Sequence, residues 1–132
     1  MARILVAASP EPRAILERVL AGHELHFAET LVEAVRSLAR RPYDLIICTI
    51  AFDESKMFDL LGLAQSTTAW KSIPFVCAIV RTHVVRAPSA RAAAAFTSRQ
   101  LGAAAFLDVA DYRTNPESGM REKIDQILEA AR

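Results

Sequence analysis

The sequence contains only four glycines and one tryptophan among its 132 residues. The glycine-rich loops that hold phosphate groups, G-x-G-x-x-G and G-x-x-x-x-G-K-[ST], do not occur, and their absence disfavours nucleotide binding of those types. No G-x-S-x-G motif and no defensible nucleophile–base pair is present either. The sequence therefore gives no basis for catalysis, and we expect a protein that is not an enzyme.

Long apolar runs are also missing. None approaches the roughly 18 residues needed to cross a bilayer. Met1 leads directly into a short apolar segment, without the long hydrophobic stretch of a signal peptide. The net charge of +1 is too close to neutral to indicate a nucleic acid or a membrane as partner. We expect a cytoplasmic protein without membrane association.

Cysteine is scarce as well. Cys48 and Cys77 are the two cysteines, and both lie within strand-like apolar runs. No cysteine or histidine stands near either of them at the spacing of metal ligands. His23, His26 and His83 form no motif, and His23 and His26 fit surface positions of an edge strand. We expect two reduced core thiols, no metal and no cofactor.

What the chain does have is a regular alternation of short apolar runs and amphipathic segments, with 52% apolar residues overall. Such alternation predicts strand–helix–strand units with parallel pairing and right-handed crossovers. Thr30 and Glu33 form a capping-box pattern at the start of one helix. We expect one α/β domain over residues 1–132, doubly wound and flavodoxin-like. The expected strands are 3–8, 23–29, 43–49, 73–80 and 103–109. The five expected helices begin near Ser9, Thr30, Met57, Ser89 and Asn115.

Three stretches carry a family resemblance. They are YDLIICTIAFDESKMFDLL (43–61), SIPFVCAIV (72–80) and LGAAAFLDVADY (101–112). These resemble the third strand and its loop, the fourth strand and the fifth strand of the receiver domain of bacterial response regulators, and the likeness extends over nearly the whole chain. It implies a five-stranded sheet with strand order 2-1-3-4-5 and five flanking helices. In that family, two carboxylates at the end of the first strand hold Mg²⁺ and an aspartate ending the third strand accepts phosphate. A Thr or Ser ending the fourth strand contacts the phosphoryl group, and a Lys ending the fifth neutralises it.

Carried over to this sequence, every one of these roles falls on a side chain without charge. The acidic pair falls on Ala7 and Ala8 (or on Ala8 and Ser9), the phosphoacceptor on Thr49, the Thr/Ser position on Ile79 and the lysine on Val109. The family's switch aromatic corresponds to Phe106. The resemblance therefore implies a receiver fold that is degenerate at its phosphorylation site.

Two carboxylates, Asp53 and Glu54, follow Thr49 in the next loop and are weak candidates for a cation site. Mg²⁺ needs several hard oxygen ligands, and the first-strand ligands are absent, so we expect these side chains to be solvated. Thr49 itself is a poor target for a protein kinase, because it ends a buried strand rather than lying on an accessible loop.

The segment between Asp59 and Asp108 contains no acidic residue. The basic residues that fall in it are Lys71, Arg81, Arg86, Arg91 and Arg99. Its connection at 81–91 is longer than the resemblance predicts, and long loops in compact domains are often functional. Arg81, Arg86 and Arg91, with Val84 and Val85 between them and Arg99 nearby, are candidates to dock an acidic partner. A solvated loop without a partner is an equal alternative.

The hypothesis that follows is a non-catalytic pseudo-receiver that works by protein–protein interaction and independently of phosphorylation. By the resemblance, the surface would be that of the fourth helix, fifth strand and fifth helix. The partner would be a histidine kinase, another regulator, a scaffold or a second copy of the chain. Two alternatives remain open: binding of a small apolar ligand in the crevice at the carboxyl edge of the sheet, and binding of nucleic acid through the 71–99 tract.

Overall fold

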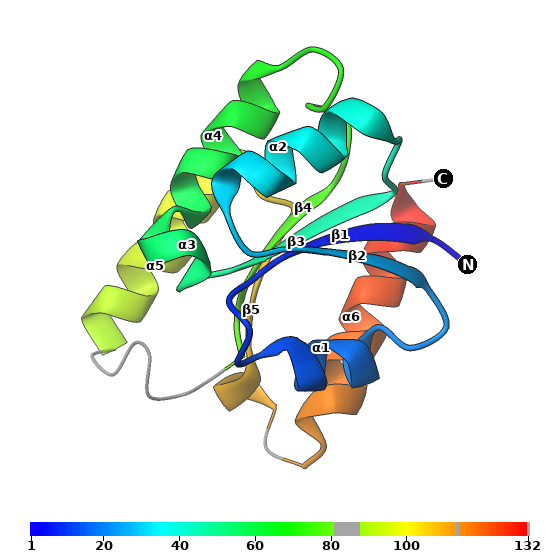
Figure 1. Ribbon diagram of the computed structural model, residues 1–132. Coiled ribbons are helices and arrows are strands. Elements are labelled where there is room, and N and C mark those ends of the chain that lie inside the picture. Colours follow the sequence, from blue (N-terminus) through cyan, green and yellow to red (C-terminus); the bar gives the residue numbers. More distant parts are fainter. Residues whose placement is uncertain (81–87, 113, 132) are drawn as a thin grey trace.

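The protein is a five-stranded parallel sheet covered by helices on both faces, as seen in a computed structural model that describes residues 1–80, 88–112 and 114–131 (Figure 1). The strand order is β2-β1-β3-β4-β5, as the resemblance implied. The strands are β1 (Arg3–Ala7), β2 (Glu24–Ala28), β3 (Leu45–Thr49), β4 (Phe75–Ile79) and β5 (Ala105–Asp108).

Helices α1 and α6 cover one face of the sheet, and α2, α4 and α5 cover the other (Figure 1). These five are the predicted helices. A sixth, the four-residue α3, was not predicted. The bounds are α1 (Arg13–Val19), α2 (Leu31–Arg40), α3 (Phe52–Ser55), α4 (Met57–Ser66), α5 (Pro88–Gln100) and α6 (Pro116–Ala130), with a 3-10 turn η1 (Val109–Asp111). No helix in these described ranges is long and apolar enough to cross a bilayer.

The central strands β3 and β4 are buried along their whole length. Their side chains alternate between two cores. Ile46 and Phe75 pack toward α2 and α4, whereas Ile47 and Val76 pack toward α1 and α6. Each fully buried aliphatic or phenyl side chain contributes roughly 1.5–3 kcal/mol. The continuous apolar runs in the sequence thus correspond to strands buried on both faces.

Three helix starts were predicted from capping residues, and two predictions are confirmed. Asn115 caps α6: its side-chain oxygen accepts a hydrogen bond from the Ser118 amide at 3.3 Å. Thr30 caps α2: its hydroxyl oxygen accepts a hydrogen bond from the Glu33 amide at 3.1 Å. The first helix, however, begins at Arg13 rather than near Ser9, with Pro12 at the capping position and no side-chain cap. The residues before it form a turn in which the Arg13 amide donates to the Pro10 carbonyl.

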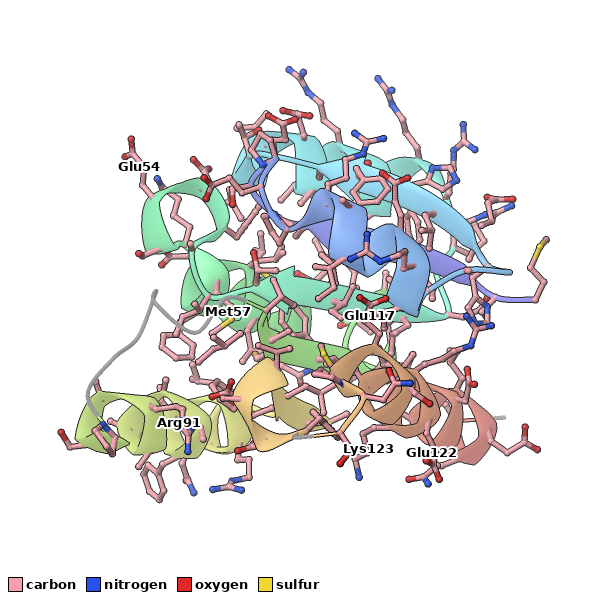
Figure 2. The ribbon with its side chains drawn as sticks, turned by 90° about the horizontal axis from the view of Figure 1, so that it is seen from below. Glu54, Met57, Arg91, Glu117, Glu122 and Lys123 are labelled. Carbon is pink, nitrogen blue, oxygen red and sulfur yellow. The ribbon has the colours of Figure 1, made fainter. Side chains whose placement is uncertain are left out.

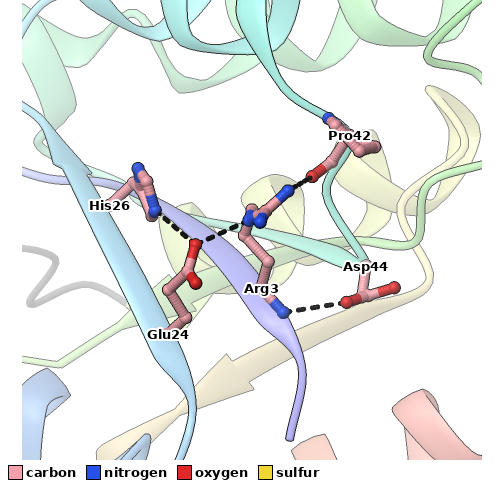
Figure 3. Close-up of polar contacts among 5 residues, drawn as sticks. All are labelled: Arg3, Glu24, His26, Pro42 and Asp44. Atoms are coloured by element: carbon pink, nitrogen blue, oxygen red, sulfur yellow. Dashed lines mark hydrogen bonds and ion pairs between the residues drawn. The ribbon is translucent and has the colours of Figure 1, made fainter.

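A polar network closes the amino edge of the sheet (Figure 3). The Arg3 guanidinium donates from Nε to Glu24 Oε2 at 2.6 Å and from Nη1 to the Pro42 carbonyl at 3.3 Å. His26 Nε2 lies 2.7 Å from the same Glu24 oxygen, and Asp44 accepts from the Arg3 amide. The expected surface histidine His26 is therefore half-buried and joined to this network, which ties β1 and β2 to the segment before β3.

The two cysteines face each other across neighbouring strands. Cys48 on β3 and Cys77 on β4 are register partners, and both are fully buried and free. Burial raises the pKa of the Cys48 thiol well above its usual range and raises the pKa of Cys77 to about 12. Both thiols therefore stay protonated at neutral pH in the folded protein. This agrees with the prediction of two reduced thiols in the core.

The raised thiol pKa values predict a loss of stability at alkaline pH. Unfolded thiols lose their protons near pH 9, whereas folded Cys77 retains its proton to about pH 12 and the pKa of folded Cys48 is also raised, so rising pH above about 9 favours the unfolded state. We expect each thiol to lower the unfolding free energy by up to about 1.4 kcal/mol per pH unit. Urea unfolding from about pH 8 to 10 measures this slope, and Cys77→Ala should make it shallower. An identical slope in that variant would contradict the assignment.

Candidate functional site

The positions to which the resemblance assigns the phosphorylation site do meet at the carboxyl edge of the sheet. Ala7, Thr49 and Ile79 end β1, β3 and β4, and Ala8 follows directly after β1. All four are buried, with at most 3% of their surface exposed. The four residues therefore lie at one edge of the sheet, and none of their side chains carries a charge.

Val109 differs from its predicted place. Strand β5 ends one residue earlier, at Asp108, which is the register partner of Ile79. The reason is local: the Asp108 carboxylate accepts a hydrogen bond from the Ala110 amide at 2.9 Å and turns the chain into η1. Val109 thus begins a 3-10 turn and does not end the strand.

Thr49 is sealed at the edge of the sheet. Only 3% of the residue is exposed, and its hydroxyl oxygen has no hydrogen-bond partner within the described structure. The cavity beside it, lined by residues 9, 11, 12, 49–51 and 78–80, measures about 30 Å³. That volume holds one or two water molecules, whereas sites for small organic ligands typically measure roughly 300–1,000 Å³. The cavity beside Thr49 is therefore too small for the apolar metabolite considered above.

Asp53 and Glu54 lie in the unpredicted turn α3. Asp53, Glu54 and Ser55 all have left-handed backbone angles, with φ of 44°, 55° and 70°. For residues other than glycine, this conformation costs roughly 1–2 kcal/mol each. The Asp53 carboxylate accepts a hydrogen bond from the Leu31 amide at 2.8 Å, at the start of α2, and this contact helps to hold the turn.

The same contact uses Asp53 as a helix cap rather than as a metal ligand. Lys56 also lies 3.7 Å from its carboxylate. Figure 2 shows Glu54 projecting from the turn, away from the sheet. Among the described residues, no group of three or more potential ligands is placed to hold a metal ion.

Sequence reasoning missed Asp108 as a structural residue. Its carboxylate, with 4% of the side chain exposed, lies 3.0 Å from Nη1 of Arg91 on α5 (Figure 2 labels Arg91). Arg91 also lies 3.8 Å from Asp111. The one available signal was an acidic residue inside an apolar strand, since a buried carboxylate requires a partner. Arg91, predicted to dock a partner, is therefore engaged within the molecule.

The other residues that were predicted to contact a partner have different environments. Arg99 is exposed at the end of α5 and makes no ion pair with the described residues. Phe96, on the same helix, is 60% exposed and was not predicted. Phe106 is half-buried and packs against the α2–α4 core. Arg81, Val84, Val85 and Arg86 lie outside the described residues.

Comparison with solved structures finds the same architecture in receiver domains. A response regulator from Hahella chejuensis superposes with a TM-score of 0.74 at 21% identity, over 97% of this chain and 95% of that one. The signal receiver domain of a signal transduction histidine kinase from Syntrophus aciditrophicus gives 0.76 at 20% identity, over 98% and 92%. This chain has the receiver-domain fold.

A third receiver structure agrees with this assignment. Chemotaxis response regulator CheY4 of Vibrio cholerae gives a TM-score of 0.72 at 20% identity, over 96% of this chain and 98% of that one. No family model and no curated protein matches the sequence. The likeness to receiver domains therefore concerns the fold, and it extends over nearly the full length of both partners.

The sealed hydroxyl of Thr49 leads to a prediction on stability. Thr49→Val removes, at nearly constant volume, a buried hydroxyl that has no partner among the described residues, and we expect the unfolding free energy to rise by about 1 kcal/mol. Thr49→Asp instead buries a carboxylate beside apolar groups and should lower it by about 3 kcal/mol. Chemical denaturation measures both. A loss of more than about 1 kcal/mol in Thr49→Val would mean that the hydroxyl has a partner.

The ion pair between Arg91 and the buried Asp108 carboxylate leads to a second prediction on stability. Arg91→Ala leaves the Asp108 carboxylate buried without its cation, and we expect the unfolding free energy to fall by about 2 kcal/mol. Arg99→Ala is the matched control on the same helix and should change it by no more than about 0.5 kcal/mol. Equal effects of the two variants in denaturant unfolding would show that the pair contributes no specific stability.

Proposed function

We propose that this protein is a pseudo-receiver: a non-catalytic signalling module that binds a protein partner and does not depend on aspartyl phosphorylation. The observation that carries the proposal is the state of the carboxyl edge of the sheet. Ala7, Ala8, Thr49 and Ile79 occupy the positions of the receiver's charged and polar site groups, and all are buried. A phosphoryl group with its cation would have no carboxylate pair to bind the cation there.

The size of the edge cavity supports the same conclusion. About 30 Å³ beside Thr49 accommodates water but not a phosphoryl group with a hydrated divalent cation. The only carboxylate among the lining residues is Glu11, at the start of the turn before α1. A single carboxylate does not supply the several oxygen ligands of Mg²⁺.

The proposed interaction surface is that of α5, β5 and α6. On α5, Phe96 and Arg99 are three residues apart and share one exposed face of the helix. Aromatic residues and arginine are enriched among residues that dominate binding energies. Because Arg99 is exposed on α5 and the sequence from Leu60 to Leu107 contains no acidic residue, an acidic segment of a protein partner is favoured at the α5 part of this surface. A histidine kinase, another regulator, a scaffold or a second copy of the chain are candidates.

The proposed independence of phosphorylation is tested by ¹⁵N–¹H NMR spectra recorded with and without Mg²⁺ and beryllofluoride. Beryllofluoride mimics the phosphoryl group of an aspartyl phosphate. We expect no change in the amide resonances of Ala8, Thr49 and Asp53, and no mass increase after incubation with acetyl phosphate. Shifts clustered at these residues, lost in Asp53→Asn, would mean that Asp53 has rebuilt an acceptor site and that the proposal is wrong.

A further inference from the structure

A second hollow lies at the opposite, amino end of the sheet, between the end of α2 and the 67–73 turn before β4. It measures about 450 Å³ and is lined by residues 38–43, 69, 70, 72 and 73, which we call the arginine hollow. Leu38, Tyr43 and Ile73 join it to the core beneath α2, and Trp70 is half-buried against the same core. Arg40 and Arg41 are exposed at the end of α2.

Both sides of the arginine hollow are fixed by hydrogen bonds. The Trp70 amide donates to the Thr67 carbonyl at 2.9 Å, and the Ile73 amide donates to the Trp70 carbonyl at 3.0 Å. On the other side, the Pro42 carbonyl accepts from the Arg3 guanidinium (Figure 3). The hollow is therefore shaped by the folded chain before anything enters it, as binding sites for small molecules usually are.

The free polar groups of the arginine hollow are mainly donors. Arg40 and Arg41 form no ion pair with any described residue, and the Trp70 indole N–H has no hydrogen-bond partner there. The lining contains no carboxylate. The last carbonyls of α2 oppose an anion, but the helix dipole amounts to only about half a charge, whereas the two guanidinium groups carry two full charges. The net charge of the groups around the arginine hollow is therefore positive and favours a negatively charged ligand.

We propose that the arginine hollow binds a small aromatic acid, that is, a planar ring joined to a carboxylate or phosphate. The ring lies against Trp70 and the apolar lining, and the anionic group pairs with Arg40 and Arg41, whose planar guanidinium groups match carboxylate and phosphate oxygens. The volume lies within the roughly 300–1,000 Å³ of small-molecule sites. This site is independent of the proposed protein-binding surface on α5.

Trp70 is the only tryptophan, so its indole N–H gives a single resolved signal in a ¹⁵N–¹H spectrum. The full chain is titrated with two matched pairs of probes: AMP against adenosine, and phenylacetate against phenylacetamide. We expect saturable shifts of the Trp70 signal with the anionic member of at least one pair. The neutral member should bind at least roughly tenfold more weakly, as the loss of a charge-assisted hydrogen bond predicts. The pair that responds distinguishes phosphate from carboxylate.

The double variant Arg40→Gln/Arg41→Gln should weaken binding of the responding anion by roughly tenfold or more, with an unchanged fold. Arg36→Gln is the matched control: it removes an exposed arginine from the same helix, outside the lining of the hollow. Its affinity should equal that of the unaltered protein. The proposal is overturned by the absence of a saturable shift with both anions up to roughly 10 mM. Equal binding of charged and neutral probes, or equal losses in the Arg36 and Arg40/Arg41 variants, would also overturn it.

Discussion

The burial of β3 and β4 between two layers of helices is the constraint on which the rest of the structure depends. Any side chain at the carboxyl end of these strands is removed from water, and a charge placed there costs several kcal/mol unless it is paired. A phosphorylation site meets this cost by gathering carboxylates, a cation and a lysine at one point. In this protein, the side chains that end or follow the inner strands at this edge include Ala7, Ala8, Thr49 and Ile79, which are buried and carry no charge.

Asp108, at the carboxyl end of β5, is a charged side chain in this region, and it is paired. Its buried carboxylate accepts hydrogen bonds from the Arg91 guanidinium and the Ala110 amide. These contacts hold β5, η1 and α5 together. Because both oxygens of the Asp108 carboxylate already have a partner, neither is free to bind a cation. The polar contacts of Asp108 therefore have a structural role at this edge.

Much of the fold could be predicted because its signals are local. The uninterrupted apolar run before Val80 specifies a strand buried on both faces, and the Thr30–Glu33 spacing specifies where α2 begins. Other features could not be predicted from local patterns. The left-handed turn at Asp53–Ser55 has no glycine to signal it and depends on the Leu31 amide 22 residues earlier in the chain. The pairing of Arg91 with Asp108, and the approach of Trp70 to Arg40 and Arg41, arise only when distant segments pack together.

Helix α5 is held near both of its ends. Close to its start, Arg91 is paired with Asp108. Close to its end, the Ser98 side chain is fully buried, and the Ser98 carbonyl accepts the Ala103 amide, which closes the last turn. Rotation of α5 on the sheet would break the Arg91–Asp108 pair and expose Ser98. A partner that docks on Phe96 and Arg99 would therefore meet a rigid, pre-organised surface and would lose little entropy in ordering it. For the docking surface that we propose on α5, this arrangement is consistent with recognition that requires no helix movement.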